Sequence, residues 1–337
     1  MSGGVDSAVA AMLAVNEGFD CTGAMMSLAS GDEKTDLTAA GAVAQRLGIP
    51  FNIFDLSGHF AACVIEPFIA EYRMGRTPNP CVICNKMLKF GKLLEMAHES
   101  GFDHIVTGHY ARVERNDKGR YILKKGIDPS KDQSYVLYTL TQEQLAQARL
   151  PLGDKTKQEV RELASGAGFD NANKKESQDI CFIPDGDYVK FITEYTGAEF
   201  TKGRFIDTDG NYLGENKGII AYTVGQRRGL GLSMPHPPYV LQLRPQDNTV
   251  VVGKEEMLYS KTLKAENINL IPFSTLETPL RANVKIRYAH PGQPATIQQL
   301  DHDTLHIEFD EPQRAITKGQ AAVIYEGDIV IGGGTIT

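Results

Sequence analysis

The amino-acid sequence predicts an α/β fold with a parallel sheet in its first half and a small antiparallel β-barrel at its C-terminus. Helix-like and strand-like segments alternate between residues 5 and 107, which is the pattern of a parallel sheet covered by helices on both faces. From about residue 248 the chain changes to short β-type runs separated by turn residues, as in a small barrel.

The first half supplies its elements in a regular order. Residues 5–17 are Ala-rich and apolar at helical spacing, so they predict the first helix. Gly48 and Pro50 end the second helix, and Gly101 ends the last one. Helices are expected over 5–17, 36–47, 57–73 and 86–100, and strands over 20–28, 51–55 and 104–107. Ligands of such sheets bind beyond the carboxyl ends of the strands.

The second half begins with two more expected helices, over 155–168 and 186–196, on either side of a polar loop from Asn171 to Asp179. The alternation of polar and apolar residues from Thr304 to Phe309 is typical of a strand with one buried face. The β-type runs of the expected barrel cover 249–253, 262–270, 280–287, 294–300, 304–309, 320–325 and 328–331.

Composition indicates an ordinary folded protein of two or three domains, since the chain has 337 residues, of which 42% are hydrophobic and 23% charged. No apolar run approaches the roughly 20 residues of a membrane-spanning helix, and no signal peptide is visible. We therefore expect a cytoplasmic protein with no membrane partner. Five cysteines, an odd and sparse set, argue against a disulfide framework.

The charge distribution is uneven. The net charge of −7 does not by itself indicate a nucleic-acid partner. Residues 71–92, however, contain five basic residues against the single acid Glu71. Clustered charge steers binding even when the net charge is unfavourable, although a solvated face is the simpler interpretation of such a segment.

The chain opens with the glycine-rich segment Ser2-Gly3-Gly4-Val5-Asp6-Ser7, directly before a helix. The two glycines allow a ligand to approach the backbone closely, and the N–H groups and dipole of a helix start favour phosphate. The two serines add hydroxyl donors, and Asp6 is a candidate ligand for Mg²⁺ on the phosphates. The segment resembles the pyrophosphate-binding loop of ATP-pyrophosphatases, which split ATP into a substrate adenylate and pyrophosphate. It lacks the Gly-Lys-Ser/Thr of a Walker loop.

Two further segments carry cysteines. Cys81-Val82-Ile83-Cys84 follows a proline-rich stretch within the basic segment, where basic neighbours and a helix N-terminus lower the pKa of a thiol. A redox pair, half of a metal site and coincidence are the three interpretations, and a four-cysteine zinc site is impossible without a second pair. Cys181 follows a polar loop, and taken alone it is best interpreted as a core thiol.

Eight motifs then point to one family. They are Ser2–Ser7, Gly75–Phe90, Thr107–Ala111, Lys131–Ser134, Ser177–Ile183, Tyr222–Gly231, Arg287-Tyr288 and Gly332–Gly334. Through them the chain resembles the bacterial tRNA-specific 2-thiouridylases (the MnmA family) over essentially its whole length. The resemblance implies a PP-loop ATP-binding catalytic domain over 1–185, a small central α+β domain over 186–246 and a C-terminal β-barrel domain over 247–337.

The resemblance also implies the reaction. Members of this family replace the C2 oxygen of the wobble uridine, at position 34 of tRNAs of the Lys, Glu and Gln type, with sulfur. ATP adenylates that oxygen, and sulfur arrives as a cysteine persulfide from a donor such as a cysteine desulfurase or a relay protein. By motif position Cys181 is the persulfide carrier and Cys84 is the nucleophile, and the two are expected to form a disulfide as sulfur is released.

The remaining site residues follow from the same motifs. The ATP contacts implied are Ser2, Gly3, Gly4, Val5, Asp6, Ser7, Met26 and Gly108. The tRNA contacts implied are Asn79, Pro80, Cys81, His109, Lys131, Asp132, Gln133, Arg287, Tyr288 and Gln320. For His109 a hydrogen-bonded structural histidine remains the alternative. We expect the target uridine to be flipped out, because a stacked base hides its C2 edge.

This sequence departs from the family in two places. Cys81 stands where many members have Asp, and a thiol cannot replace a carboxylate directly. Either another group handles the proton, or Cys81, Cys84 and Cys181 act together; an iron–sulfur cluster on these three thiols is the hypothesis that follows from the second case. Relatives also carry a strand before the glycine-rich loop, whereas Met1 directly precedes Ser2, so the first strand is expected to be missing. Either ATP binding is weak or the coding sequence begins farther upstream.

Two rival functions remain at this point. The first is another ATP-pyrophosphatase activity, such as amide formation, and the cysteine pair argues against it. The second is a tRNA-binding protein whose catalysis is impaired by the missing strand.

Overall fold

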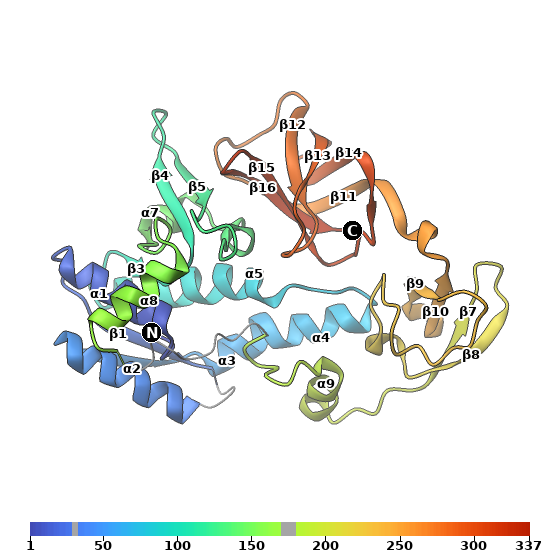
Figure 1. Ribbon diagram of the computed structural model, residues 1–337, viewed down its shortest axis with the longest axis horizontal. Coiled ribbons are helices and arrows are strands. Elements are labelled where there is room, and N and C mark those ends of the chain that lie inside the picture. Colours follow the sequence, from blue (N-terminus) through green and yellow to red (C-terminus); the bar gives the residue numbers. More distant parts are fainter. Residues whose placement is uncertain (29–32, 170–179) are drawn as a thin grey trace.

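The computed structural model describes residues 1–28, 33–169 and 180–337. An N-terminal α/β part lies at one end of the molecule, a small sheet lies at the other, and a β-barrel stands over the helices between them (Figure 1). The expected polar loop over 171–179 lies outside the described residues. In the part of the chain described, no helix is long and apolar enough to cross a membrane.

The N-terminal part contains two short parallel strand pairs, β1–β2 and β3–β6. Its first elements are α1 (Val5–Asn16), β1 (Gly23–Ser27), α2 (Glu33–Leu47), β2 (Phe51–Asp55) and β3 (Ile105–Val106). Each lies within about three residues of its expected range. Among the described strands β2 is the only one paired with β1, and the Met1 ammonium donates a hydrogen bond to the Ala24 carbonyl in β1.

Two long helices cross the middle of the molecule, and each contains a π-helical stretch. The first combines α3 (Ser57–Phe60), η1 (Ala61–Ile65) and α4 (Glu66–Arg73), which confirms the helix expected over 57–73. The second combines α5 (Pro80–Cys84), η2 (Asn85–Lys92) and α6 (Leu93–Glu99). It begins six residues before the expected start at 86, because Asn79 caps it and a proline occupies its first turn.

A side chain from α7 (Gln142–Gln147) stabilises the π-helical stretch η2. The Gln144 amide donates to the carbonyls of Lys86 and Phe90 at 3.1 and 2.8 Å, so these carbonyls have partners despite the irregular helix. The following helix, α8 (Lys157–Gly166), confirms the one expected over 155–168. Thr156 and Glu159 form a capping box at its start.

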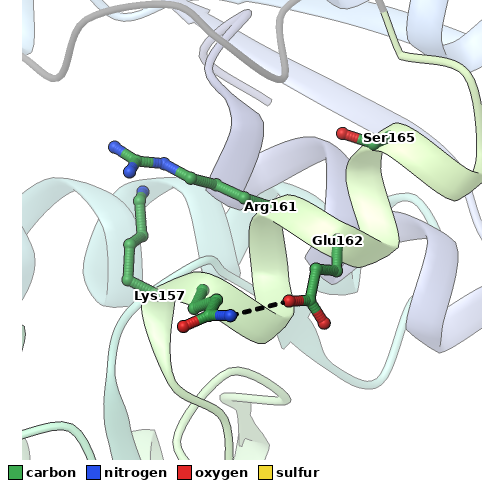
Figure 2. A pocket seen from close by; sticks show the side chains of 5 residues that line it. Lys157, Arg161, Glu162 and Ser165 are labelled. Carbon is green, nitrogen blue, oxygen red and sulfur yellow. Dashed lines mark hydrogen bonds between the residues drawn. The ribbon is translucent and has the colours of Figure 1, made fainter.

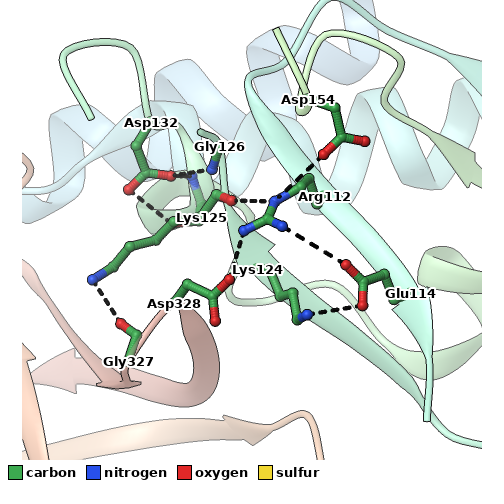
Figure 3. A network of polar contacts seen from close by, with 10 residues as sticks. Arg112, Glu114, Lys124, Lys125, Gly126, Asp132, Asp154, Gly327 and Asp328 are labelled. Carbon is green, nitrogen blue, oxygen red and sulfur yellow. Dashed lines mark hydrogen bonds and ion pairs between the residues drawn. The ribbon is translucent and has the colours of Figure 1, made fainter. Parts of the chain in front are cut away.

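The hairpin of β4 (Ala111–Arg115) and β5 (Tyr121–Lys125) was not expected from the sequence. It extends from the N-terminal part to the barrel, where β5 pairs with the last strand of the chain. Figure 3 shows the polar contacts at this junction: Arg112 donates to Asp328 at 2.6 Å and Lys125 to the Gly327 carbonyl at 3.0 Å. The hairpin and the barrel therefore share one sheet.

The central part contains α9 (Tyr188–Thr196) and a four-stranded sheet ordered β8-β7-β10-β9. Its strands are β7 (Gly203–Ile206), β8 (Tyr212–Asn216), β9 (Tyr239–Arg244) and β10 (Thr249–Gly253). The run over 249–253 was expected in the barrel, but β10 pairs with β7 and β9. The correction follows from tertiary pairing, which a single β-type run does not specify.

The C-terminal part is a closed antiparallel barrel of six strands in the order β11-β14-β13-β12-β15-β16, with β16 returning to β11. The strands are β11 (Tyr259–Leu270), β12 (Leu280–Lys285), β13 (Gln293–Gln299), β14 (Thr304–Arg314), β15 (Ala321–Glu326) and β16 (Ile329–Ile336). Leu305, Ile307 and Phe309 point into the barrel core and are almost fully buried, which confirms the alternation seen in the sequence.

Candidate active site

Ser7 closes the glycine-rich loop before α1 into a tight turn. Its hydroxyl donates to the Gly4 carbonyl at 3.0 Å and accepts from the Ser2 backbone N–H at 3.1 Å. Gly3 has a φ of 68°, and a Cβ at this position would lie 2.9 Å from the Asp36 carbonyl oxygen, so only glycine fits. No described side chain caps α1, which leaves its first turn, beginning at Val5, suited to an anion.

Asp6, in the first turn of α1, is already engaged by two side chains. The Lys157 ammonium donates to both carboxylate oxygens, at 2.7 and 2.8 Å, and the Tyr110 hydroxyl donates to Oδ1 at 2.8 Å. Mg²⁺ requires carboxylate oxygens at close range in octahedral geometry. Because the ammonium occupies both oxygens, the arrangement does not fit the expected Mg²⁺ ligation by Asp6.

Two other expected ATP contacts lie around this loop. Gly108, just beyond β3, packs directly on it, since a Cβ there would lie 2.7 Å from the Asp6 carbonyl carbon and 2.9 Å from the Ser7 nitrogen. Met26 lies near the carboxyl end of β1, half-buried against the main core. Both therefore occupy the edge where ligands of a parallel sheet bind.

Cys81 and Cys84 lie at the two ends of α5. The Asn79 carboxamide accepts the backbone N–H of Cys81 at 3.1 Å, and Pro80 occupies the first helical turn. Cys81 is exposed, whereas Cys84 is half-buried and packs against the core. Asn79 and Pro80, expected as tRNA contacts, thus also fix the start of the helix that carries both thiols.

The chain before α5 is held by the other two parts of the molecule. A Cβ at Gly75 would lie 2.9 Å from Leu243 of the central sheet. Gln320 of the barrel donates to the Thr77 carbonyl at 2.8 Å, and the Thr77 N–H donates to the Lys318 carbonyl at 2.9 Å. The position of Cys81 therefore depends on all three parts.

Cys181 reaches the same site from a distant part of the sequence. The next residue, Phe182, anchors it, because its ring packs edge-on against Phe60 and Phe68 with centroids 5.4 Å away in each case. A negative charge on Cys84 or Cys81 raises the pKa of the Cys181 thiol, so the three thiols lie within electrostatic range. All five cysteines are free thiols in this structure.

The pKa values of the three thiols are not lowered, contrary to what the basic segment predicted. Loss of hydration is the largest influence on all three, although the side chains of Cys81 and Cys181 keep exposed surface; it raises the pKa values of Cys81 and Cys84, and that of Cys181 to about 11. The positive charge of Lys89 lowers the pKa of each thiol, but by less than the lost hydration raises it. The expected lowering of the thiol pKa is therefore wrong for this conformation, because the lost hydration outweighs the nearby positive charge.

Lys89 connects the cysteines with the ATP loop. It lies on η2, one helical turn after Cys84, and its charge acts on all three thiols. Burial lowers the pKa of the His109 imidazole and of the Met1 amine, the latter to about 6, and the Lys89 charge lowers both further. One ammonium therefore lies within range of both halves of the site.

His109 follows Gly108 and is buried. Its Nδ1 lies 2.7 Å from the Thr107 hydroxyl, and its ring lies 6.1 Å from that of Phe90. Burial lowers the pKa of the imidazole well below its usual value, so the ring is neutral at pH 7. These contacts match the structural alternative for this residue.

The expected tRNA contacts of the catalytic part and the barrel meet in one place. The Tyr288 hydroxyl donates to the Asp132 carbonyl at 3.1 Å; burial raises the pKa of Tyr288, and the charges of Asp132 and Cys81 raise it further. Tyr288 and the neighbouring Arg287 are exposed. Lys131 precedes Asp132 in this loop, so the region combines positive charge with an accessible aromatic ring.

Asp132 and Gln133, two of the expected tRNA contacts, hold the backbone of their own loop by hydrogen bonds. The Asp132 carboxylate accepts the backbone N–H groups of Gly126 and Ser134, at 3.2 and 3.1 Å. Gln133 exchanges two hydrogen bonds with the backbone of Tyr110, at 2.9 and 3.0 Å. They shape the loop that presents Lys131.

Comparison with known proteins agrees with this three-part organisation. Family models for the tRNA methyl transferase HUP domain, the tRNA methyl transferase PRC-barrel domain and the aminomethyltransferase beta-barrel domain match residues 1–185, 189–254 and 260–336. The tRNA-specific 2-thiouridylase MnmA of Clostridioides difficile is 46% identical over 347 residues, which cover 100% of this chain and 96% of the relative. The chain belongs to the tRNA-specific 2-thiouridylase family.

Other 2-thiouridylases are equally similar. MnmA 1 of Caldanaerobacter subterraneus is 48% identical over 349 residues, covering 100% of this chain and 96% of the relative. MnmA of Lachnoclostridium phytofermentans is 43% identical over 348 residues, covering 100% and 98%. The resemblance inferred from the eight motifs is thereby confirmed.

The sequence did not assign roles to three residues that this 2-thiouridylase places at its site: Lys157, Tyr110 and Lys89. Lys157 carried only a helix-start signal, the Thr156-x-x-Glu159 pattern. Tyr110 and Lys89 lay inside family motifs, but nothing local indicates that they contact Asp6 or face the thiols. No group of three or more His, Cys, Asp or Glu side chains in the described parts of the chain is arranged to hold a metal ion.

Proposed function

We propose that this protein is a tRNA-uridine 2-sulfurtransferase that uses ATP to convert the wobble uridine of its tRNA to 2-thiouridine. The observation that carries the proposal is the convergence of Cys81, Cys84 and Cys181 on one site, with Lys89 within electrostatic range of both the thiols and the ATP loop. Full-length relatives that bear the name tRNA-specific 2-thiouridylase support it.

The reaction begins with adenylation. The uridine C2 oxygen bonds to the α-phosphorus of ATP and pyrophosphate leaves, so a poor leaving group becomes AMP. Residues 2–7 and Gly108 bind the nucleotide, and Mg²⁺ enters as part of the Mg–ATP complex. His109, beside the loop, is buried and has a lowered pKa, so its imidazole stays neutral at pH 7.

Sulfur transfer completes the reaction. The outer sulfur of a Cys181 persulfide bonds to C2, and AMP leaves with the original oxygen. The Cys84 thiolate then attacks the Cys181 sulfur, which breaks the persulfide bond, leaves the outer sulfur on the base and forms a Cys84–Cys181 disulfide. A cellular thiol reductant and a sulfur-donor protein, such as a cysteine desulfurase or a relay protein, reset the site. Five free thiols suit a reducing compartment, which we propose to be the cytoplasm.

The proposed tRNA contacts fall into two groups. We infer that Asn79, Pro80 and Cys81, at the start of α5, contact the flipped base. Lys131, Arg287, Tyr288 and Gln320 lie on the loops between catalytic part and barrel that border this position. Raising the salt concentration should weaken tRNA binding steeply, since phosphate contacts release counterions.

A direct assay tests the function. The enzyme is incubated with ATP, Mg²⁺, a persulfide donor and tRNA of the Lys, Glu or Gln type, and the digested tRNA is examined for 2-thiouridine by mass spectrometry. Cys84→Ser and Cys181→Ser should each abolish product and keep tRNA affinity within about twofold. Cys21→Ser is the matched control, because Cys21 precedes β1 and shares no charge interaction with the site. Full activity in either site variant would contradict the sulfur path, and tRNA binding without product would favour an impaired tRNA-binding protein.

The iron–sulfur cluster on Cys81, Cys84 and Cys181 is the competing chemistry. The shared location of the three thiols favours it, whereas the lack of a three-ligand arrangement among the described side chains disfavours it. Anaerobic purification followed by iron and sulfide assays separates the two. A colourless, iron-free and fully active enzyme excludes the cluster, and bound iron that each Cys→Ser change removes would establish it.

A further inference from the structure

An open pocket of about 520 Å³ lies on α8 beside the glycine-rich loop and is lined by Lys157, Gln158, Arg161, Glu162 and Ser165. Figure 2 shows that the cationic ends of Lys157 and Arg161 project to the same side of the helix, as expected for residues four positions apart. Gln158 and Glu162 pair with each other at 2.9 Å on another face. The pocket therefore brings two cationic side chains together beside the Glu162 carboxylate.

Lys157 is fixed in this position by several contacts. Its backbone N–H donates to the Asp128 carboxylate at 3.0 Å, which holds the first turn of α8. Its ammonium lies 5.8 Å from the centre of the Tyr110 ring and pairs with Asp6 as described above. Its side chain is only 8% exposed, so the ammonium has little freedom to move away from the loop.

The charge balance of the loop explains why a lysine belongs there. Asp6 puts a negative charge in the first turn of α1, where the phosphates of a nucleotide would bind, and like charges repel. The Lys157 ammonium cancels that charge at 2.7 Å, and Arg161 adds a further positive charge on the same side. Lys157 thus neutralises the acidic residue at the start of α1.

We propose that Lys157 and Arg161 bind the phosphates of ATP and the departing pyrophosphate, and that Asp6 is the positioning residue of Lys157 and not a ligand of Mg²⁺. This inference rests on the proposed use of ATP, and it adds α8 to the nucleotide site. It also resolves the disagreement between the expected role of Asp6 and its observed partners.

Binding of inorganic pyrophosphate in EDTA, measured by calorimetry on the full chain, tests the proposal without metal and without turnover. Lys157→Met and Arg161→Met should each weaken binding about 10- to 100-fold, the loss typical of one charge-assisted hydrogen bond. Lys124→Met is the matched control, since Lys124 forms a comparable 2.8 Å ion pair with Glu114 on the distant hairpin. The pyrophosphate affinity of this variant should equal that of the wild type.

The double variant Asp6→Asn/Lys157→Met gives the decisive comparison. Removing the Asp6 charge should restore pyrophosphate affinity at least severalfold over Lys157→Met alone. If Lys157→Met folds poorly because its Asp6 carboxylate has lost the ammonium, the double variant removes that cause as well. In Asp6→Asn alone, the Mg²⁺ concentration that half-saturates ATP binding should stay within twofold of wild type.

Three results would overturn the inference: wild-type pyrophosphate affinity in both Lys157→Met and Arg161→Met, no recovery in the double variant, or a tenfold higher Mg²⁺ requirement in Asp6→Asn. Wild-type thiolation alongside any of them would leave the proposed function intact. A wild-type chain that binds neither ATP nor pyrophosphate and yields no 2-thiouridine would refute both.

Discussion

The pKa of Cys181 gives the sharpest quantitative prediction. Burial, together with the charges of Cys84 and Cys81, raises this pKa from 9.0 to about 11. At pH 8 a thiol of pKa 9 is about one-tenth thiolate, whereas a thiol of pKa 11 is about one-thousandth thiolate. Because only the thiolate is alkylated, Cys181 should react with iodoacetamide about 100-fold more slowly at pH 8 than a cysteine of pKa 9, although its side chain is exposed.

The pH dependence follows from the sign of the shift. A raised thiol pKa favours the neutral form, so the thiolate fraction of Cys181 should keep rising tenfold per pH unit from pH 7 to at least pH 10. The assay is alkylation of the full chain at each pH, with the modified peptide quantified by mass spectrometry. A rate that levels off by pH 8.5 would refute the reasoning.

Lys89 offers an independent check on the cause. Its ammonium favours the thiolate of Cys181, so Lys89→Met should raise the pKa further and slow alkylation at pH 8 by several- to about tenfold. Lys86→Met is the control, because Lys86 is exposed on the same helix and does not act on the thiols. Equal rates in the two variants would show that Lys89 is too distant to matter.

Three further predictions concern the scaffold. Gly108→Ala places a Cβ 2.7 Å from the Asp6 carbonyl carbon, so ATP affinity should fall at least tenfold while tRNA affinity in a gel-shift assay stays at the wild-type level. Tyr135→Phe removes the buried 2.9 Å hydrogen bond to the Ala321 carbonyl, and the free energy of unfolding measured in urea should fall by about 1 kcal/mol with an unchanged m-value. Asn79→Ala removes the cap of α5 and should cost about 1 kcal/mol in the same assay, whereas Asn79→Ser, which keeps an acceptor, should recover most of it; equal losses in both would argue against the capping role.

Local patterns in the sequence were sufficient for most of the elements. The alternation over 304–309 and the turn residues between barrel runs correctly located six barrel strands, because each strand has one face in the core. The helices over 5–17 and 57–73 were visible for the same reason. What failed was the assignment of pairing partners: β10 has the composition of a barrel strand, yet its neighbours are β7 and β9.

Only the site residues that lie within sequence motifs could be predicted. The sequence indicated the loop around Asp6 and the cysteines, but the ion pair between Asp6 and Lys157 joins residues 151 positions apart and leaves no local pattern. The thiol pKa values were predicted with the wrong sign, because charge can be counted in the sequence whereas burial depends on packing. Lys89 appeared only as one of five basic residues.

The junction of β5 with β16 has a consequence for synthesis on the ribosome. The hairpin is completed near residue 125, but the strand that covers its edge begins at Ile329, roughly 200 residues later. At about 5–20 residues per second, the edge of β5 remains without that strand for roughly 10 to 40 s. The hairpin is therefore translated long before the strand that covers its edge, and emergence of β16 from the ribosome is the event that completes this sheet. Truncation of only the last strand should consequently leave an aggregation-prone chain with an exposed sheet edge.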